Sequence, residues 1–417
     1  MNATESALLD RIWDMPILDT HEHLPLRPAL RETPCDVLTE YLSHYFDKDL
    51  ISAGMPRPLL DQALDPSLDI EERFARIEPW WDLCRLTGYG RALDEAARGL
   101  YGEARVDRAS IGRMNEAFQR GVQDGGHFRK VLKDKCRISR SVNDGFAHMK
   151  GSGWSDDELF AQVLRLDGYL EGWNFLWDLL GEYGTDMRTF EGFLAAVRAD
   201  LLASPSYGYA GYKLGVAYSR PLYFARAAFD AFLPVFLQDR LAPVPRALQD
   251  YILRFCLGIL QEMGAFVQIH TGFQEGNGNI VANSDPLLLT ELLQDFPGVR
   301  FDLFHIGYPY VRQTGVLAKL FPNATVDFAW VNIISPLAAE NALCEYLDLI
   351  PQNKIFAFGG DYLFVDGVYG HQVQARRTVA RALARKVEDG ALDLEAAERT
   401  ARRLLHDNAM DKLGIRL

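Results

Sequence analysis

Four of the nine histidines and one aspartate stand at the ends of short apolar segments. His21 and His23 end the first such segment, which begins at Pro16. Residues i and i+2 of a strand point to the same side, so both imidazoles can reach one cation. Neutral imidazole and carboxylate are the ligands that a borderline divalent ion prefers, so this pattern predicts a metal site. The other members of the set are His270, His305 and Asp361.

The predicted metal site has an open coordination shell. His21, His23 and His270 would supply three nitrogens, and Asp361 would add one oxygen and leave room for water. An open shell of this kind is typical of catalytic rather than structural sites. We expect zinc there, although manganese, nickel and iron suit the same donor set. Taken singly, His270 could be an interior histidine and Asp361 a turn or helix cap, so the prediction depends on the whole set.

Strand and helix signals alternate along most of the chain and favour an α/β fold, a (β/α)₈ barrel. A doubly wound sheet is the competing architecture, but it normally carries GxGxxG after its first strand, and none follows here. In a barrel the carboxyl ends of all strands open onto one face, where the five residues would converge. The eight expected strands are Pro16–Asp19, Cys136–Val142, Leu159–Leu166, Tyr209–Ala217, Ala265–His270, Val299–His305, Ala324–Val331 and Lys354–Gly359.

The length of the chain indicates one barrel domain over residues 1–417 with inserted helices. A barrel takes about 250 residues, which leaves about 167 for insertions. Residues from about 35 to 135 carry apolar side chains at helical spacing and few strand signals, which predicts a helical insertion after the first strand. We expect this insertion to close over the catalytic mouth. A second helical insertion is expected at about 222–263, interrupted near Pro243.

The composition excludes several functional classes. Lys+Arg 44 against Asp+Glu 57 gives a net charge of −13, which argues against a nucleic-acid or anionic-membrane binder. Neither a signal peptide nor an apolar run long enough to span a membrane is present. Five scattered cysteines without a CxxC pair indicate free thiols in a reducing cytoplasm. The expected partner is a small-molecule substrate, and the oligomeric state, including a homo-oligomer, is left open.

The order HxH, Lys, His, His, Asp resembles the amidohydrolase superfamily of metal-dependent barrel enzymes. Within it, the chain looks most similar to uronate isomerases and to the amidohydrolase domain of glutamine-synthetase-fused proteins. Residues 17–25 (ILDTHEHLP) resemble the first-strand motif of uronate isomerases, and residues 270–279 (HTGFQEGNGN) resemble the fifth-strand segment of both groups. Residues 404–414 (LLHDNAMDKLG) are similar to the closing helix of this branch. The resemblance covers residues 16–25 and 209 onward, and it leaves the helical insertion unassigned.

The resemblance implies roles for the metal-site residues. His21, His23 and Asp361 would hold the primary metal, and His270 would be a ligand or lie immediately beside it. His305 would bind a second metal or polarise the substrate. The chain is therefore expected to bind one divalent ion, or two.

Lys213 matches the position at which many superfamily members carry a carboxylated lysine that bridges two metals. The alternative, which we favour slightly, is a strand-end lysine that contacts an anionic substrate. The chain also departs from the family pattern, because uronate isomerases carry an Arg soon after the eighth-strand Asp. Here no Arg follows Asp361 until Arg376, which weakens the isomerase interpretation.

The first functional prediction is a hydrolase in which metal-activated water attacks an amide, lactone or similar acyl bond. Asp361 would be ligand and general base together. Arg140 and Arg165, near the ends of the second and third strands, could bind a substrate carboxylate bidentately, and a surface salt bridge is the simpler role for each. Tyr308 and Trp330 follow strands and could line the pocket.

Three alternatives accompany the hydrolase prediction. An aldose–ketose isomerase of a sugar acid would use the same metal to hold a carbonyl and its neighbouring hydroxyl. A decarboxylase on the same scaffold is a more distant alternative. The alternative from another class is a non-catalytic protein that binds a metal or a sugar acid, whose mark would be a missing ligand, and no ligand is visibly missing here.

Overall fold

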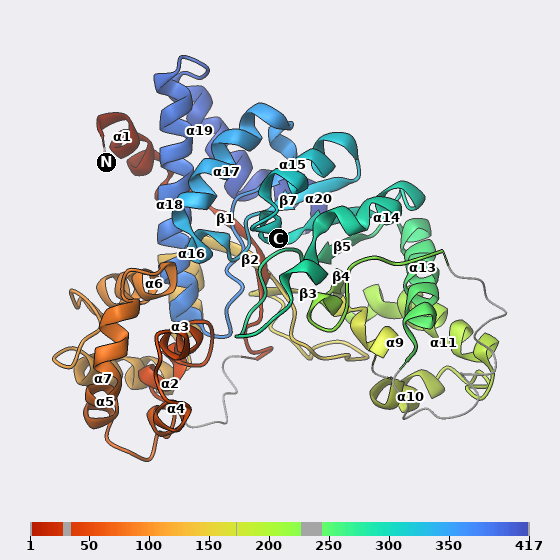
Figure 1. Ribbon diagram of the computed structural model, residues 1–417, viewed down its shortest axis with the longest axis horizontal. Helices are drawn as coiled ribbons and strands as arrows, with labels where there is room; N and C mark the ends of the chain where they lie inside the picture. Colours follow the sequence, from red (N-terminus) through yellow and green to blue (C-terminus); the bar gives the residue numbers. More distant parts are fainter. Residues whose placement is uncertain (1, 28–34, 172, 227–243, 416–417) are drawn as a thin grey trace.

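The computed structural model describes residues 2–27, 35–171, 173–226 and 244–415. Its central feature is one eight-stranded sheet in which sequential strands pair in parallel from the first to the eighth (Figure 1). The predicted α/β barrel is confirmed. The strands are β1 (Ile17–Glu22), β2 (Ile138–Asn143), β3 (Phe160–Arg165), β4 (Tyr209–Leu214), β5 (Phe266–Ile269), β6 (Arg300–Leu303), β7 (Ala324–Asp327) and β8 (Ile355–Phe356).

Hydrogen bonds between β1 and the segment that follows β8 close the barrel. The Thr20 amide donates to the Phe358 carbonyl at 3.1 Å, and the His23 amide donates to the Tyr362 carbonyl at 3.0 Å. The short β8 therefore continues as an irregular strand edge as far as Tyr362. This closure brings the end of β1 directly beside the residues that follow β8.

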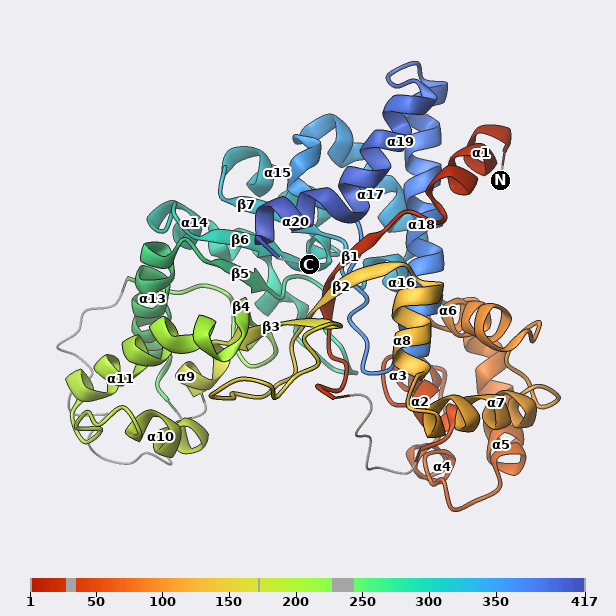
Figure 2. The same ribbon diagram turned by 180° about the vertical axis from the view of Figure 1, so that it is seen from behind.

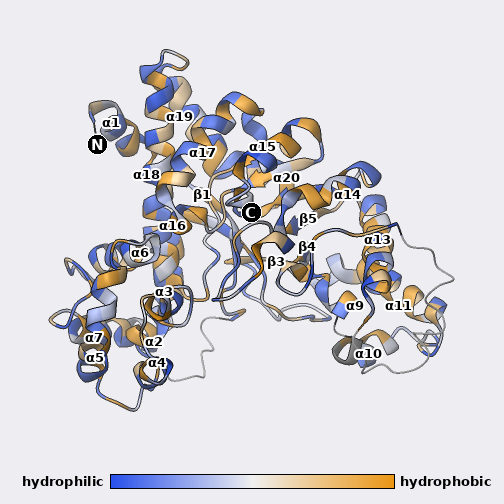
Figure 3. Cartoon of the chain, viewed as in Figure 1, coloured by the Kyte–Doolittle hydropathy of each residue, from blue (hydrophilic) through white to orange (hydrophobic). Residues whose placement is uncertain are grey.

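Helices connect the strands around the barrel. Figure 3 shows hydrophobic residues along the central strands and a mixture of hydrophilic and hydrophobic residues along the surrounding helices, as expected where only one helix face packs on the sheet. The helices outside the β1–β2 connection are α1 (Ala3–Ile12), α9 (Asp167–Glu171), α10 (Trp173–Gly181), α11 (Phe190–Ala203), α13 (Arg246–Met263), α14 (Thr290–Asp295), α15 (Val311–Leu320), α16 (Val331–Ile334), α17 (Pro336–Leu349), α18 (Val365–Glu388), α19 (Leu394–Arg402) and α20 (Asn408–Leu413). Short helical turns accompany them: η4 (Ser204–Tyr207), η5 (Val216–Tyr218), η7 (Val281–Ser284), η8 (Pro286–Leu289), η9 (Phe304–Gly307), η10 (Gln352–Lys354) and η11 (Arg403–Asp407).

The connection between β1 and β2 forms a helical subdomain. Both ribbon views show α2 to α7 gathered beside the lower part of α18, across the barrel from α10 and α11 (Figures 1 and 2). These helices lie within the predicted insertion at about 35–135. They are α2 (Val37–Tyr41), α3 (Phe46–Ser52), α4 (Arg57–Ala63), α5 (Ile70–Cys84), α6 (Gly88–Ala96), η2 (Ala97–Tyr101), α7 (Ile111–Gln123), α8 (His127–Arg129) and η3 (Lys130–Lys135).

The second predicted helical insertion, at about 222–263, is helical over α13. Residues 227–243 of that prediction lie outside the described residues. Residues 222–226 are not helical, because their backbone groups bond to other segments. The Leu222 amide donates to the Asn283 carbonyl, and the Arg254 side chain on α13 donates to the Phe224 carbonyl.

The amino-terminal end of the barrel is plugged, so the open end lies at the carboxyl ends of the strands. Ala409 and Leu413 of α20 pack against Leu18 and Phe356 in one buried cluster. Asn408 donates from Nδ2 to the Ile355 carbonyl at the start of β8, at 3.0 Å. No helix among the described residues is both long enough and apolar enough to cross a membrane.

Candidate active site

The side chains of His21, His23 and Asp361 converge at the carboxyl end of the barrel. His21 Nε2 lies 3.3 Å from His23 Nε2. Asp361 Oδ1 lies 3.3 Å from His23 Nε2 and 3.9 Å from His21 Nε2. Since one ligand atom from each residue lies within 4.8 Å of the others, a single ion can contact all three. We call these residues the triad.

The protonation states of the triad suit a metal. His23 Nδ1 lies 2.9 Å from the Asp144 carbonyl and therefore donates to it, which leaves the Nε2 lone pair facing the triad. Burial, followed by the charge of Lys213, lowers the pKa of His21 well below its usual value. Burial opposes ionisation of Asp361, but the contact with His23 and the neighbouring histidines hold the pKa of that carboxyl well below its usual range. Neutral imidazoles and an ionised carboxylate are the forms that bind a divalent cation, so these residues fit one.

His305 and His270 lie next to the triad. His305 Nδ1 lies 2.8 Å from the Ala329 carbonyl and donates to it, and its Nε2 lies 3.7 Å from Asp361 Oδ2. The same Nε2 lies 3.1 Å from His270 Nδ1, and His270 Nε2 lies 2.9 Å from the Phe273 carbonyl. His270 thus approaches the triad through His305 rather than as part of it. As a metal ligand, His270 stays a prediction.

Lys213 projects from β4 into the same region. Its Nζ lies 3.6 Å from the centroid of the Phe304 ring, so an aromatic face covers the ammonium group. Burial lowers the pKa of Lys213 to about 8, although the carboxylates of Asp361 and Asp144 oppose this shift. An amine with a lowered pKa suits either predicted role, the carboxylated bridge or the contact to an anionic substrate.

A cavity of about 350 Å³ opens in front of the triad. Its size suits a small substrate, at the lower end of the range for ligand pockets. The barrel contributes residues that sequence reasoning selected, and the insertion contributes residues that it missed. The cavity lining includes His23, Arg165, Lys213, His270, Trp330 and Asp361 from the barrel, and His44, Tyr45 and Lys48 from the insertion.

The insertion forms one wall of this cavity. The Tyr45 hydroxyl donates to the backbone carbonyl of Asp361. The His44 ring stacks on Tyr45 with centroids 3.6 Å apart, and burial lowers the pKa of His44 to about 3, so this imidazole is neutral. Lys48 Nζ lies 3.4 Å from the Glu275 carboxylate, which follows β5. Apolar spacing in the predicted insertion at about 35–135 did not indicate that His44 and Tyr45 would face the site.

Several residues of the site have left-handed backbone conformations. The φ angles are 68° at Tyr45, 59° at His305, 65° at Trp330 and 59° at Asp361. Such a conformation costs about 1–3 kcal/mol for a residue other than glycine and persists only where surrounding contacts impose it. Their concentration around the triad indicates that packing holds these side chains in place.

Two predicted substrate contacts lie outside the cavity lining. Arg140 is the third residue of β2 rather than a residue of its carboxyl end, and its guanidinium donates to the Phe160 carbonyl at 2.9 Å. Tyr308 packs against the hydrophobic cluster shared by the insertion and α16–α18. Arg165 does line the cavity, and its Nε donates to Asp144 Oδ2 at 2.8 Å. The register of β2 therefore removes one of the two predicted arginines from the site.

The carboxyl-terminal part of the chain matches a known family. Residues 224–415 match the amidohydrolase family model. This match supports the resemblance to the amidohydrolase superfamily over these residues. Among curated proteins, this chain is 28% identical to Protein fluG of Emericella nidulans over 170 residues, which cover 39% of this chain and 20% of that protein. The chain thus spans about one fifth of the length of this relative.

Solved structures resemble this chain along almost its whole length. A uronate isomerase from Thermotoga maritima superposes with a TM-score of 0.78 at 15% identity and covers 99% of this chain and 98% of that one. A protein of Lactobacillus casei described as a metal-dependent hydrolase superposes with a TM-score of 0.68 at 16% identity, covering 98% and 99% of the two chains. At these identities the likeness shows the fold alone.

Proposed function

We propose that the protein is a metal-dependent hydrolase that cleaves an amide, lactone or similar acyl bond in a small, carboxylate-bearing substrate. The observation that carries the proposal is the triad His21, His23 and Asp361 facing a cavity that also holds Lys48 and Lys213. We propose zinc as the cation. A divalent cation bound there supplies an acidified water, whose pKa falls from about 15.7 toward 7, and polarises the carbonyl.

Asp361 is the residue we assign as general base. Its Oδ1 faces His21 and His23, and its Oδ2 faces His305 Nε2 at 3.7 Å. Asp361 therefore accepts the proton of the attacking water and passes it to the leaving group. Burial, opposed by Asp361, lowers the pKa of His305 to about 4, so His305 is neutral at pH 7. Because the Nδ1–H group of His305 donates to the Ala329 carbonyl, its Nε2 carries a lone pair. This lone pair can bind a cation or accept a proton, but it cannot donate a hydrogen bond to a substrate carbonyl.

The cations of the cavity would bind the substrate carboxylate. Arg165 already donates from Nε to Asp144 Oδ2, and its Nη2 lies 2.8 Å from the same oxygen. Its Nη1 lies 3.9 Å from Asp167 Oδ1, too far for a hydrogen bond, so Nη1 would be the donor to a substrate oxygen. Lys48 and Lys213 approach from the insertion and from the barrel. Opposed cations of this kind orient an anionic substrate across the cavity, so that its acyl group reaches the triad.

The second candidate is an isomerase of a sugar acid. In its favour, the uronate isomerase of Thermotoga maritima matches 99% of this chain, including the helical subdomain. Against it, the first arginine after Asp361 is Arg376, which is buried and donates to the Ile12 and Cys136 carbonyls. The Arg376 guanidinium is hydrogen-bonded to backbone carbonyls in the protein interior and therefore does not bind a sugar acid in the cavity. We therefore rank hydrolysis first.

Within the described residues, Cys84, Cys136, Cys256 and Cys344 are buried free thiols. Unpaired cysteines are usual in reducing compartments. We include a cytoplasmic location in the proposal on this ground.

Isotope-labelled water separates the two reactions. The full-length protein is incubated with N-acyl amino acids, lactones and uronates in H₂¹⁸O, and the products are analysed by mass spectrometry. Hydrolysis places one ¹⁸O in the product carboxylate, whereas isomerisation leaves the mass of the substrate unchanged after correction for carbonyl exchange. Turnover of a uronate alone, without label in a carboxylate, would favour the isomerase and contradict the hydrolase. His23→Ala is the inactive control.

A further inference from the structure

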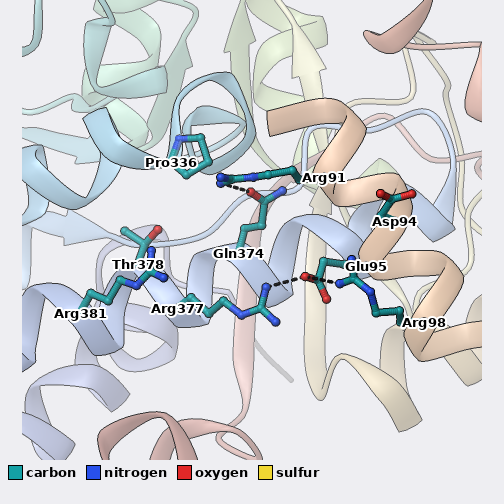
Figure 4. A pocket seen from close by; sticks show the side chains of 9 residues that line it. All are labelled: Arg91, Asp94, Glu95, Arg98, Pro336, Gln374, Arg377, Thr378 and Arg381. Atoms are coloured by element: carbon teal, nitrogen blue, oxygen red, sulfur yellow. Dashed lines mark hydrogen bonds and ion pairs between the residues drawn. The ribbon is translucent and has the colours of Figure 1, made fainter. Parts of the chain in front are cut away.

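A second cavity lies away from the triad, at the seam between the helical subdomain and the barrel. It encloses about 210 Å³ between α6 and α18, next to the start of α17. Figure 4 shows arginine side chains entering it from both helices. The lining residues are Arg91, Asp94, Glu95 and Arg98 on the subdomain side, Gln374, Arg377, Thr378 and Arg381 on α18, and Pro336 on α17.

The carboxylates of this cavity are already engaged. Glu95 lies between two of the arginines, at 2.7 Å from Arg98 Nη1 and 2.5 Å from Arg377 Nη1. Asp94 accepts two hydrogen bonds from Arg85, at 3.0 and 3.2 Å. Arg85 does not line the cavity, so it neutralises Asp94 from outside. The positive charge of the four lining guanidinium groups therefore exceeds the negative charge of the lining carboxylates, although the whole chain has a net charge of −13.

Two of the guanidinium groups lack a close counterion. Within the described residues, no carboxylate lies within 4.0 Å of Arg91, whose Nη2 donates to Gln374 Oε1 at 3.2 Å. Gln374 is fixed in turn, because its Nε2 donates to the Gly88 carbonyl at 2.9 Å. Arg381 approaches Glu340 only at 3.8 Å, and Glu340 is shared with Arg385. Arg91 and Arg381 thus keep donors available for an anion.

The electrostatics of the seam favour an anion. Burial lowers the pKa of Arg91, and the charges of Arg381 and Arg377 lower it further. Like charges held together in a partly buried cavity repel one another, and a multivalent anion relieves this repulsion. Arginine matches both carboxylate and phosphate through parallel N–H donors. A phosphate has more acceptor oxygens than a carboxylate, so it can accept from two opposed arginines at once.

We propose that this seam cavity binds a phosphate dianion, either inorganic phosphate or the phosphate group of a small ester. The volume of 210 Å³ corresponds to about seven water molecules, enough for a phosphate and a short substituent. It is smaller than the cavities of about 300–1,000 Å³ that hold drug-sized ligands. Arg91 and Arg381 supply donors from opposite sides, and the Thr378 hydroxyl lies in the same lining.

An anion bound in the seam cavity would also stabilise the wall that the insertion contributes to the catalytic cavity. A Cβ atom on Gly370 of α18 would lie 1.9 Å from the Ala92 carbonyl of α6, so the two helices are in direct contact. Tyr89, near the start of α6, stacks on Tyr45 of the catalytic cavity with centroids 5.1 Å apart. An anion bridging α6 and α18 would hold this wall against the barrel. We therefore expect phosphate to raise the melting temperature of the protein.

The test measures phosphate binding to the full-length protein by isothermal titration calorimetry and by thermal shift. Arg91→Gln and Arg381→Gln each remove one donor, and Arg188→Gln is the control, because Arg188 is 87% exposed and its loss changes the net charge equally. Lys48→Gln controls for phosphate binding in the catalytic cavity. We expect saturable binding at one seam site, weakened about tenfold or more in the two seam variants and unchanged in the two controls. Circular dichroism verifies that each variant is folded.

Three results would overturn the proposal: no saturable phosphate binding, seam variants that bind as the wild type does, or binding lost in Lys48→Gln but retained in Arg91→Gln. Tighter binding of malonate than of phosphate would also contradict it, because the site would then be a carboxylate site. Glycerol 3-phosphate distinguishes the two sources of the phosphate group. Tighter binding of the ester assigns the site to a phosphate ester, and tighter binding of inorganic phosphate assigns it to the free ion.

Discussion

The Tyr45 hydroxyl in the helical subdomain donates a hydrogen bond to the backbone carbonyl of Asp361, 316 positions further along the chain. Both residues have left-handed backbone conformations, with φ of 68° and 59°. The helical subdomain thereby contacts the residue that completes the triad. This contact explains how an insertion after β1 takes part in positioning the site.

Tyr45→Phe removes this hydrogen bond and keeps the ring. We expect a loss of about 1 kcal/mol in the free energy of unfolding, because a buried carbonyl loses its donor. We also expect kcat to fall while the metal content stays unchanged, since the backbone of Asp361 becomes less constrained. Tyr212→Phe is a matched control, because its buried hydroxyl donates to the Leu201 carbonyl outside the site. Equal kinetic effects of the two variants would refute the positioning role of Tyr45.

Lys213→Met tests the two roles of that lysine. If Lys213 is a carboxylated bridge, the wild type holds two metal ions and the variant holds fewer. If it contacts substrate, the metal count stays the same and KM rises, because the ammonium charge is lost from the cavity. Elemental analysis together with steady-state kinetics decides between them. A wild-type count of two that remains two in the variant would eliminate the bridge.

His127 gives the stability of the protein a dependence on pH. Its Nε2 lies 2.7 Å from Asp366 Oδ1, at the start of α18. Burial alone would lower the pKa of His127, but the charge and the hydrogen bond of Asp366 outweigh burial and raise the pKa above 6.5. Because the folded-state pKa is raised, the pair stabilises the fold fully below the unfolded-state pKa near 6.5 and loses its contribution as the pH rises through the folded-state value.

The measurement for this pair is urea unfolding of the wild type and of His127→Gln across that pH range. We expect the stability difference between them to be largest in mild acid and to shrink toward alkaline pH. A difference that is constant with pH, or that grows as the pH rises, would show that ionisation of His127 is not involved.

Replacement of glycine by alanine should have opposite effects on stability at two positions, Gly370 in α18 and Gly258 in α13. Gly370→Ala places a methyl group 1.9 Å from the Ala92 carbonyl, where α6 and α18 meet. We expect a loss of about 1–3 kcal/mol in stability, the usual effect of overpacking. Gly258→Ala in α13 meets nothing within 4 Å and should stabilise the helix by about 0.5–1 kcal/mol. Thermal or urea unfolding compares them, and destabilisation by Gly258→Ala would contradict the packing described for α13.

The sequence was sufficient to predict the barrel because its strands are short and apolar and the last four recur at similar intervals. The expected strand Ala265–His270 appears as Phe266–Ile269, and the expected Val299–His305 appears as Arg300–Leu303. Helix α15 contains Gly315, a residue with low helix propensity. A Cβ atom at Gly315 would lie 2.6 Å from the Tyr346 ring, so glycine is needed there for packing rather than for a turn.

The sequence predicted the site less well where strand register or tertiary contacts determine which residues line the cavity. Strand β2 runs from Ile138 to Asn143 instead of the expected Cys136 to Val142, so Arg140 is its third residue and lies farther from the carboxyl end than expected. His44 and Lys48 line the cavity because the whole subdomain docks on the barrel, and apolar spacing alone does not reveal which helix face meets the site. Lys48 in particular has no local motif and is recognisable only through its ion pair with Glu275.

The most direct test is metal analysis of the purified wild type and of His23→Ala, with His406→Ala as a control histidine outside the triad. His406 contacts Asp407 near the carboxyl terminus, and its replacement should leave the metal content unchanged. We predict at least one equivalent of a divalent metal in the wild type and loss of both metal and hydrolysis in His23→Ala. A His23→Ala variant that retains the wild-type metal content and full turnover would contradict the assignment of the triad as the catalytic metal site.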